Sequence, residues 1–208
     1  MFYFMQLDIN IWTSYDDTID SESDPPLKKE SPIFTVAMAL CMQISLPPEM
    51  PYRKTIQTIS CRNGIDPRLV ASVIWTESRF RAKMIRTEKD GHLSVGLMQI
   101  KRSTAREIGF RGPLRKLMIP WINVFYGVKY LKNRIRHYSY GWDSVSAYNG
   151  GRPLWSRTRF RYLNHGYVLS VWRHYRNLCH GSVVIRPEKW HSEEWPIQMA
   201  LLTRPVRQ

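Results

Sequence analysis

The central part of the chain carries apolar residues at helical spacing, interrupted by short polar stretches. Asp66 followed by Pro67 is typical of a helix start, because aspartate caps the first turn and proline fits the first helical position. Val70 and Ile74 then recur on one face. At about 100° per residue, Glu77 falls in the same apolar sector. The pattern therefore predicts a helix that carries a carboxyl group on its buried face.

Two further apolar stripes at the same spacing predict helices downstream. One consists of Val124, Val128, Leu131 and Ile135, and the other of Leu163, Tyr167, Val171, His174 and Leu178. A polar, turn-rich stretch at residues 87–91 follows the first helix, and another helix is expected around residues 103–107. Helices joined by short loops are thus expected to dominate the fold.

The length and composition favour one folded domain with extensions. The chain has 208 residues, 43% of them hydrophobic, and only three cysteines, which excludes a disordered chain, a collagen-like repeat and a small disulfide scaffold. We divide it into an acidic head at 1–27, a signal-peptide-like segment at 28–46, the domain at 47–180 and a C-terminal extension at 181–208. The head is expected to be disordered or to precede the true start.

Charge is divided unevenly along the sequence. Residues 1–46 hold seven acidic and two basic residues, whereas the remainder holds ten acidic and 29 basic residues, giving net charges of −5 and +19. A body this cationic attracts polyanions, whether nucleic acid, an anionic lipid surface or an acidic cell-wall polymer. Charge alone does not select among them.

Residues 28–46 have the pattern of an export signal. Two lysines precede Ile33–Leu46, an uncharged apolar run of 14 residues that suits a signal-peptide core and is short for a membrane span. Ala37–Ala39 fits the small-residue rule for a cleavage site. The alternative is a helix or strand buried at the edge of the domain. We favour export to the periplasm or cell envelope and predict no lipid anchor at Cys41.

The cysteines and histidines predict one disulfide at most. Cys61 and Cys179 bracket the domain, and they either pair in an oxidising compartment or remain as two buried thiols. The six histidines are scattered, and no pair of Cys or His has the spacing of zinc ligands. We therefore expect neither a metal nor a cofactor. The sequence does not indicate the oligomeric state.

Glu77 carries the clearest candidate chemistry. A carboxyl group among apolar side chains resists ionisation and can keep its proton near neutral pH, which suits a general acid. The alternative is that Glu77 lies at the edge of the stripe, where it reaches solvent or pairs with Arg81 four residues on. The helix by itself leaves both open.

Three short motifs in order add to this pattern. Glu77-Ser78 is followed by Gly96–Ile100, which reads GLMQI, and by Ala147–Gly150, which reads AYNG; Tyr167 lies on a later helix. Together they resemble the soluble lytic transglycosylase family over about residues 55–178. The resemblance implies a lysozyme-like α+β fold, mostly helical, in which a single catalytic domain holds a glycan-binding groove.

The resemblance also implies an activity. Members of the family cleave the β-1,4 bond between N-acetylmuramic acid and N-acetylglucosamine in peptidoglycan without water, and they leave a 1,6-anhydro sugar. Glu77 matches the family's catalytic glutamate, which acts first as acid and then as base. No cofactor is implied, and the expected partner is the peptidoglycan glycan strand rather than nucleic acid.

The second motif supplies several expected roles. Gly96 would allow close backbone approach at the groove, and Met98 and Gln99 would line the sugar sites. Leu97 and Ile100 are expected in the core.

The first and third motifs and Tyr167 supply the remaining roles. Ser78 would help to orient Glu77 through a hydrogen bond. Tyr148 and Tyr167 would flank the glutamate, although a packing tyrosine is the alternative for either. Asn149 would bond to acetamido or hydroxyl groups of the substrate.

Three other functions remain open. Glu88 and Asp90 lie where goose-type lysozyme, a hydrolase of the same superfamily, carries acids, so hydrolysis is the first. A nucleic-acid-binding module with Arg157, Arg159 and Arg161 on phosphates is the second. An inactive glycan-binding protein is the third.

Overall fold

The computed structural model describes residues 32–139, 141–156, 158 and 161–180. Helices dominate these residues, namely α1 (Pro32–Met42), α2 (Arg53–Arg62), α3 (Pro67–Ser78), α4 (Arg102–Glu107), the 3₁₀ helix η3 (Leu114–Met118), α5 (Pro120–Tyr138), α6 (Trp142–Gly150) and α7 (His165–Cys179). Two small sheets complete the fold. The expected mostly helical α+β class is confirmed. The acidic head, the start of the signal-like segment and the C-terminal extension lie outside the described residues.

Local sequence features determine where helix α3 begins and ends. The Asp66 carboxylate accepts a hydrogen bond from the Arg68 N–H at 2.8 Å, and Pro67 occupies the first turn. The helix stops at Arg79, whose backbone is left-handed at φ 51°. Its apolar face is buried against α2 and α7. The predicted helix, with its cap, is therefore confirmed.

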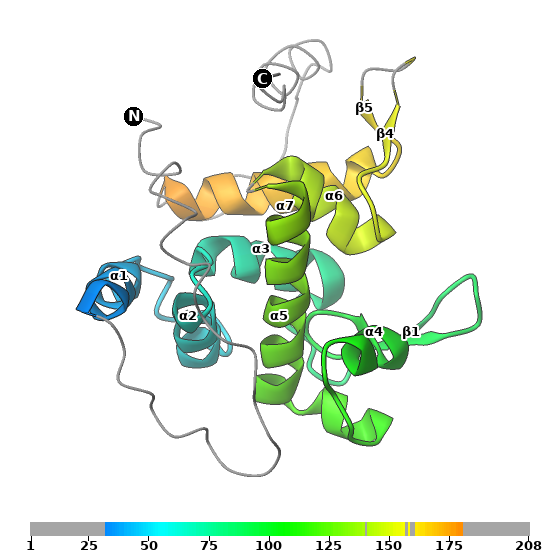
Figure 1. Cartoon of the computed structure of the whole chain (residues 1–208), viewed down its shortest axis with the longest axis horizontal. Coiled ribbons are helices and arrows are strands. Elements are labelled where there is room, and N and C mark those ends of the chain that lie inside the picture. The colour runs from blue at the N-terminus through cyan, green and yellow to red at the C-terminus, as the bar shows by residue number, and fades with distance from the viewer. Residues whose placement is uncertain (1–31, 140, 157, 159–160, 181–208) are drawn as a thin grey trace.

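Helix α5 runs through the middle of the domain (Figure 1). Val124, Val128 and Leu131 of its predicted stripe are buried and Ile135 is partly buried; α5 packs against α2 and α6. In α7 the buried positions are Val168 and Val171. Leu163, expected in the same stripe, precedes the helix and is 60% exposed, so the predicted stripe began too early.

A three-stranded antiparallel sheet lies beside α4 (Figure 1). Its strands are β1 (Ile85–Thr87), β2 (Leu93–Val95) and β3 (Ile100–Lys101). The register places Arg86 opposite Ser94, and Ser94 opposite Lys101. A second hairpin joins β4 (Trp155–Ser156) to β5 (Arg161–Tyr162).

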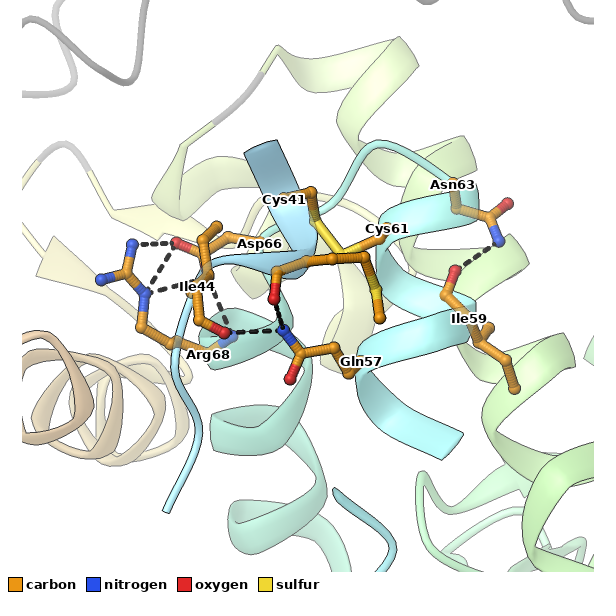
Figure 2. Close-up of a disulfide and its surroundings, with 9 residues drawn as sticks. Cys41, Ile44, Gln57, Ile59, Cys61, Asn63, Asp66 and Arg68 are labelled. Atoms are coloured by element: carbon orange, nitrogen blue, oxygen red, sulfur yellow. Dashed lines mark hydrogen bonds and ion pairs between the residues drawn. A yellow bond between two sulfur atoms is a disulfide. The ribbon is translucent and has the colours of Figure 1, made fainter. Parts of the chain in front are cut away.

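A disulfide joins Cys41 of α1 to Cys61 of α2 (Figure 2). The expected alternatives for Cys61, a bond to Cys179 or a free thiol, are therefore both wrong. Cys179 is a free, exposed thiol at the end of α7. Cys41 lies inside the signal-like run, whose expected removal left Cys61 and Cys179 as the candidate pair.

Polar contacts also hold the apolar run to the domain. The Gln57 side-chain amide donates to the carbonyls of Met42 at 3.1 Å and Ile44 at 2.6 Å (Figure 2). Leu46 is fully buried in the core. Most of the run Ile33–Leu46 thus forms α1 and a linker packed on α2. Among the described residues, no helix is both long enough and apolar enough to cross a bilayer.

Candidate active site

A cavity of about 350 Å³ opens between the end of α3, the three-stranded sheet and α6. Glu77 of α3 faces Arg86 and Glu88 from the first strand and its turn. Tyr148 and Asn149 of α6 also line it. The structure thus brings the glutamate of the first motif together with the tyrosine and asparagine of the third.

Glu77 is the penultimate residue of α3, and its side chain is only 6% exposed. Burial raises the pKa of its carboxyl group to about 7. Tyr167 and Arg86 lower this pKa, whereas the negative charge of Glu88 raises it. Arg81 does not take the role expected in the alternative, because its Nε donates to the Ser78 carbonyl. The prediction of a buried carboxyl group is confirmed.

Tyr148 and Tyr167 flank the glutamate. The Tyr148 hydroxyl donates to the main-chain carbonyl of Met98 at 2.8 Å. The Tyr167 hydroxyl is buried without a partner of good hydrogen-bond geometry in the described part of the chain, yet it lies near enough to favour the ionised Glu77. Burial and the Glu77 charge raise the pKa of both tyrosines well above the ordinary value. Both therefore stay protonated beside the carboxyl group.

Asn123 of α5 holds the second motif in shape. Its side chain accepts from the Met98 N–H at 2.7 Å and donates to the carbonyls of Val95 at 2.9 Å and Leu117 at 2.6 Å. Gly96 has φ 80°, and a Cβ there would overlap the Asn123 amide. The glycine thus allows a left-handed turn and the close approach of Asn123. This approach comes from within the protein, rather than from the groove side as expected.

Of the other residues in the second motif, Met98 is the one that does not lie where it was expected. Met98 is fully buried against Gly127 and does not line the cavity, which corrects the expected sugar contact. Leu97 and Ile100 are buried in the core as expected, and Ile100 also borders the cavity. Gln99 lines the cavity, and its Nε2 donates to two main-chain carbonyls at 2.9 and 3.1 Å.

Ser78 and Asn149 make contacts that bear on their expected roles. The Ser78 hydroxyl is buried and donates to the Ile74 carbonyl of its own helix at 3.2 Å, so its orienting role remains a prediction. Asn149 is exposed at the cavity, and its Oδ1 accepts from Asn164 Nδ2 at 3.0 Å. Asn164 also bonds to the Ser146 carbonyl and hydroxyl. Asn164 is therefore a support for Asn149 that the sequence did not suggest.

Arg86 lines the cavity and contacts Glu77, although no pattern in the sequence predicted it there. Its Nη2 donates to the Glu77 carbonyl at 2.9 Å, and its Nη1 lies 3.5 Å from the Glu77 carboxylate. The available signal was strand alternation, which places Arg86 on the face opposite to the exposed Ile85 and Thr87. A strand of three residues is too short for that alternation to stand out.

Of the described acidic and basic residues that the alternative functions would use, only Glu88 lines the cavity. Glu88 lines the cavity, whereas Asp90 is exposed and pairs with Lys101 at 2.6 Å, a contact that lowers the pKa of Asp90. Arg157 and Arg159 lie outside the described residues, and Arg161 is exposed on β5. Across the described ranges, no cluster of three or more His, Cys, Asp or Glu side chains is placed to hold a metal ion.

The fold and the buried glutamate beside a cavity define a lysozyme-like α+β domain. Residues 54–160 match the family model described as the transglycosylase SLT domain. The chain therefore belongs to the transglycosylase SLT family. The resemblance drawn from the three motifs is confirmed.

Several curated relatives agree with this assignment. The chain is 31% identical over 118 residues to invasion protein IagB of Salmonella typhimurium, covering 55% of this chain and 71% of that protein. It is 30% identical over 116 residues to the X polypeptide of Escherichia coli K12, covering 55% and 68% of the two chains. Protein IpgF of Shigella flexneri is 28% identical over 104 residues, covering 49% and 68%.

A solved structure supports the fold. The lytic transglycosylase Slt of Pseudomonas aeruginosa, determined as an inactive mutant, superposes with a TM-score of 0.52 at 19% sequence identity. The match covers 65% of this chain but only 25% of that one. The lysozyme-like fold is therefore shared, whereas most of the larger protein has no counterpart in the match.

Proposed function

We propose that this protein is a peptidoglycan lytic transglycosylase in which Glu77 is the acid and then the base. The observation that carries the proposal is a single buried carboxyl group on the cavity wall with a pKa of about 7. Near neutral pH such a group is present in comparable amounts with and without its proton, so it can both give and take one. The family and the fold support the same activity.

In the first step, protonated Glu77 donates its proton to the glycosidic oxygen between N-acetylmuramic acid and N-acetylglucosamine. The bond from the muramic acid C1 to that oxygen breaks, and the N-acetylglucosamine leaves with a new 4-hydroxyl group. General-acid assistance of this kind contributes about 10² to 10⁴ in rate. The low exposure of Glu77 favours the step, because a neutral acid is retained where an exposed glutamate would be ionised.

In the second step, the Glu77 carboxylate removes the proton from the muramic acid 6-hydroxyl. That oxygen attacks C1 on the same sugar, so a bond between C1 and O6 replaces the bond that broke. The product is a 1,6-anhydro sugar, the acid is restored, and no water is consumed. Arg86 and the Tyr167 hydroxyl favour the carboxylate form that exists between the two steps.

The cavity offers groups for substrate contact. Asn149 is exposed at the cavity, and its amide group can bond to acetamido and hydroxyl groups of a glycan. Asn164 holds the Asn149 side chain through a hydrogen bond to its Oδ1. Tyr148 lines the same wall beside Glu77.

A hydrolase is the second candidate, and Glu88 is the observation that favours it. Its carboxyl group lines the same cavity as Glu77, so it could activate a water molecule as the second acid of a glycosidase does. The products separate the two reactions. A hydrolase leaves reducing muramic acid ends, whereas a transglycosylase leaves anhydro ends.

Export to the cell envelope follows from the proposed substrate and is supported by the Cys41–Cys61 disulfide (Figure 2). Disulfides form and persist in oxidising compartments such as the periplasm and are rare in the cytosol. The bond joins the first two helices of the described domain. We therefore place the folded protein outside the cytoplasm.

The test is to incubate the purified, oxidised protein with purified peptidoglycan and to weigh the released muropeptides. We expect anhydro ends from the wild type and no release above background from Glu77→Gln. Glu49→Gln is the matched control, because Glu49 is an exposed glutamate outside the cavity. Reducing ends would identify a lysozyme, and full activity of Glu77→Gln would exclude the proposed acid.

A further inference from the structure

Arg86 contacts Glu77 at two points. From β1, Nη2 donates to the main-chain carbonyl at 2.9 Å, and Nη1 lies 3.5 Å from the carboxylate Oε2. A guanidinium group is planar and holds its donors in a fixed fork, so one side chain can meet both atoms at once. A lysine carries its charge on a single nitrogen and has no such fork.

The β1–β2 hairpin places the Arg86 side chain beside Glu77. Successive side chains of a strand face opposite sides, so exposed Ile85 points away while Arg86 faces the cavity. Arg86 pairs with Ser94 of β2, which also lines the cavity. At the base of the hairpin, the Gly96 N–H donates to the Met84 carbonyl at 2.8 Å. The hairpin therefore delivers the guanidinium to the end of α3.

Arg86 and Arg81 both serve the C-terminal end of α3. The last carbonyls of a helix lack donors within the helix, and cations are favoured there. Arg86 donates to the Glu77 carbonyl, whereas Arg81 donates through Nε to the Ser78 carbonyl at 3.1 Å. Of these two arginines, Arg86 alone has an ion pair with the Glu77 carboxylate. Arg81 is therefore a control for the helix-end contact without the carboxylate contact.

We propose that Arg86 is a positioning residue for the acid of this site, because its two-point contact fixes the Glu77 carboxyl group against the cavity and links it to the β1–β2 hairpin. The inference rests on the proposed function of Glu77. Arg86 acts through the carboxyl group rather than on the reacting bond. Its side chain is 42% exposed, so the link can also respond to a glycan that enters the cavity.

Several groups surround the carboxyl group and set its protonation. Arg86 and Glu88 face it from the sheet side, Tyr148 from α6 and Tyr167 from α7. Arg86 and Tyr167 lower the pKa of Glu77, whereas burial and Glu88 raise it. Loss of Arg86 therefore raises this pKa further. The protonated acid then persists to higher pH, and the alkaline limb of the activity profile moves upward with it.

The first experiment follows the Glu77 carboxyl carbon by NMR titration in the wild type, R86Q, R86K and R81Q. We expect R86Q to raise the Glu77 pKa by about half to one pH unit, a modest effect because solvent screens a half-exposed charge. In R86K and R81Q the pKa of Glu77 should match that of the wild type. R86K keeps the positive charge, and Arg81 does not contact the carboxylate. A titration that R86Q leaves unchanged or lowers overturns the proposal.

The second experiment measures kcat and KM on peptidoglycan. R86K keeps the charge but lacks the fork, so we expect kcat to fall about tenfold with little change in KM, because a misplaced acid slows the chemical step. R81Q should keep the wild-type kcat. Full kcat in R86K refutes the positioning role. If R86Q does not fold, the kcat of R86K compared with that of the wild type is sufficient to test the proposal.

The two proposals fail in different ways. If the wild type releases no sugar fragments while the R86Q titration moves as expected, the proposed function fails and the Arg86 contact stands. If the wild type is active while both the R86Q titration and its alkaline limb stay in place, the positioning role fails and the function stands.

Discussion

Ionisation of Glu77 should make the protein less stable as the pH rises, and Glu77→Gln should remove this effect. Burial raises the pKa of the carboxyl group from its ordinary value of 4.5 to about 7 in the folded protein. The folded state therefore keeps a proton over a range in which the unfolded chain has lost it. The resulting stability is fully present below pH 4.5 and is lost as the pH rises through about 7.

The size of the effect follows from the two pKa values. Their difference corresponds to about 3 kcal/mol in the free energy of unfolding. Between pH 5 and pH 8 the contribution of Glu77 falls by about 2 to 3 kcal/mol, because part of it is already lost by pH 5. Domains are typically stable by about 5 to 15 kcal/mol, so this is a measurable share.

The assay is urea unfolding of the wild type and Glu77→Gln at pH 5, 6, 7 and 8. The quantity to compare is the difference between the two proteins at each pH. This difference is needed because His174 also titrates. Burial against Trp75 lowers the pKa of His174 to about 4, so the stability that the neutral imidazole contributes is lost as the pH falls. Both proteins carry His174, so its opposite trend cancels. The variant should gain about 2 to 3 kcal/mol on the wild type between pH 5 and pH 8.

One result refutes the reasoning. If the difference between the two proteins stays within about 0.5 kcal/mol over this range, the folded and unfolded carboxyl groups titrate alike. Glu77 would then have an ordinary pKa and be ionised at neutral pH. The proposed acid would lack its proton, whatever the fold.

Three further predictions follow from contacts around the site. Asn123→Ala should lower stability by about 3 kcal/mol in thermal unfolding, because it leaves one N–H and two carbonyls without their buried partner; an unchanged melting temperature would contradict this. Glu88→Gln should lower the pKa of Glu77 and shift the alkaline limb to lower pH while anhydro products persist. Loss of product with Glu88→Gln would instead point to a second essential acid. Cys41→Ser should reduce stability by about 3 kcal/mol in oxidised protein but not in protein reduced beforehand, since the bond closes a sequence separation of 20.

Long helices with regular apolar spacing were predictable. Helix α3 carries its cap, its proline and its buried face in one local stretch of sequence, and the position of Glu77 follows from the same geometry. The stripe of α5 is equally regular, and all of it except the partly buried Ile135 is buried as expected. Leu163 shows the limit of the method, because it has the spacing of α7 but precedes the helix start at His165. Periodicity finds a face more reliably than it finds an end.

The cavity itself was predictable only in part. The motifs identify Glu77, Gln99, Tyr148 and Asn149 as neighbours, and these residues line the cavity. Met98 was misplaced because it lies in a turn-like segment between β2 and β3, where neither helical nor strand spacing says which way a side chain faces. Ile100, at the start of a two-residue strand, is buried in the core as expected.

Arg86 and Asn123 reach the site through tertiary contacts that no local pattern encodes. Asn123 is far from Val95 and Met98 in the sequence, yet it forms hydrogen bonds with both and with Leu117. Arg86 stands nine residues after Glu77 and meets it because a hairpin folds back. Both contacts depend on where separate elements pack, which a single sequence does not reveal.

The disulfide restricts how an export signal could work in this protein. A cut near the end of the apolar run Ile33–Leu46 would remove Cys41 and leave Cys61 without its partner. A cut after Ala39 would keep Cys41 but remove most of α1. A segment that stays attached would keep both the bond and the Gln57 contacts to Met42 and Ile44. Any exported form must therefore retain Cys41 to form the bond, and a mature chain that begins beyond residue 41 would contradict the folded arrangement of α1 and α2.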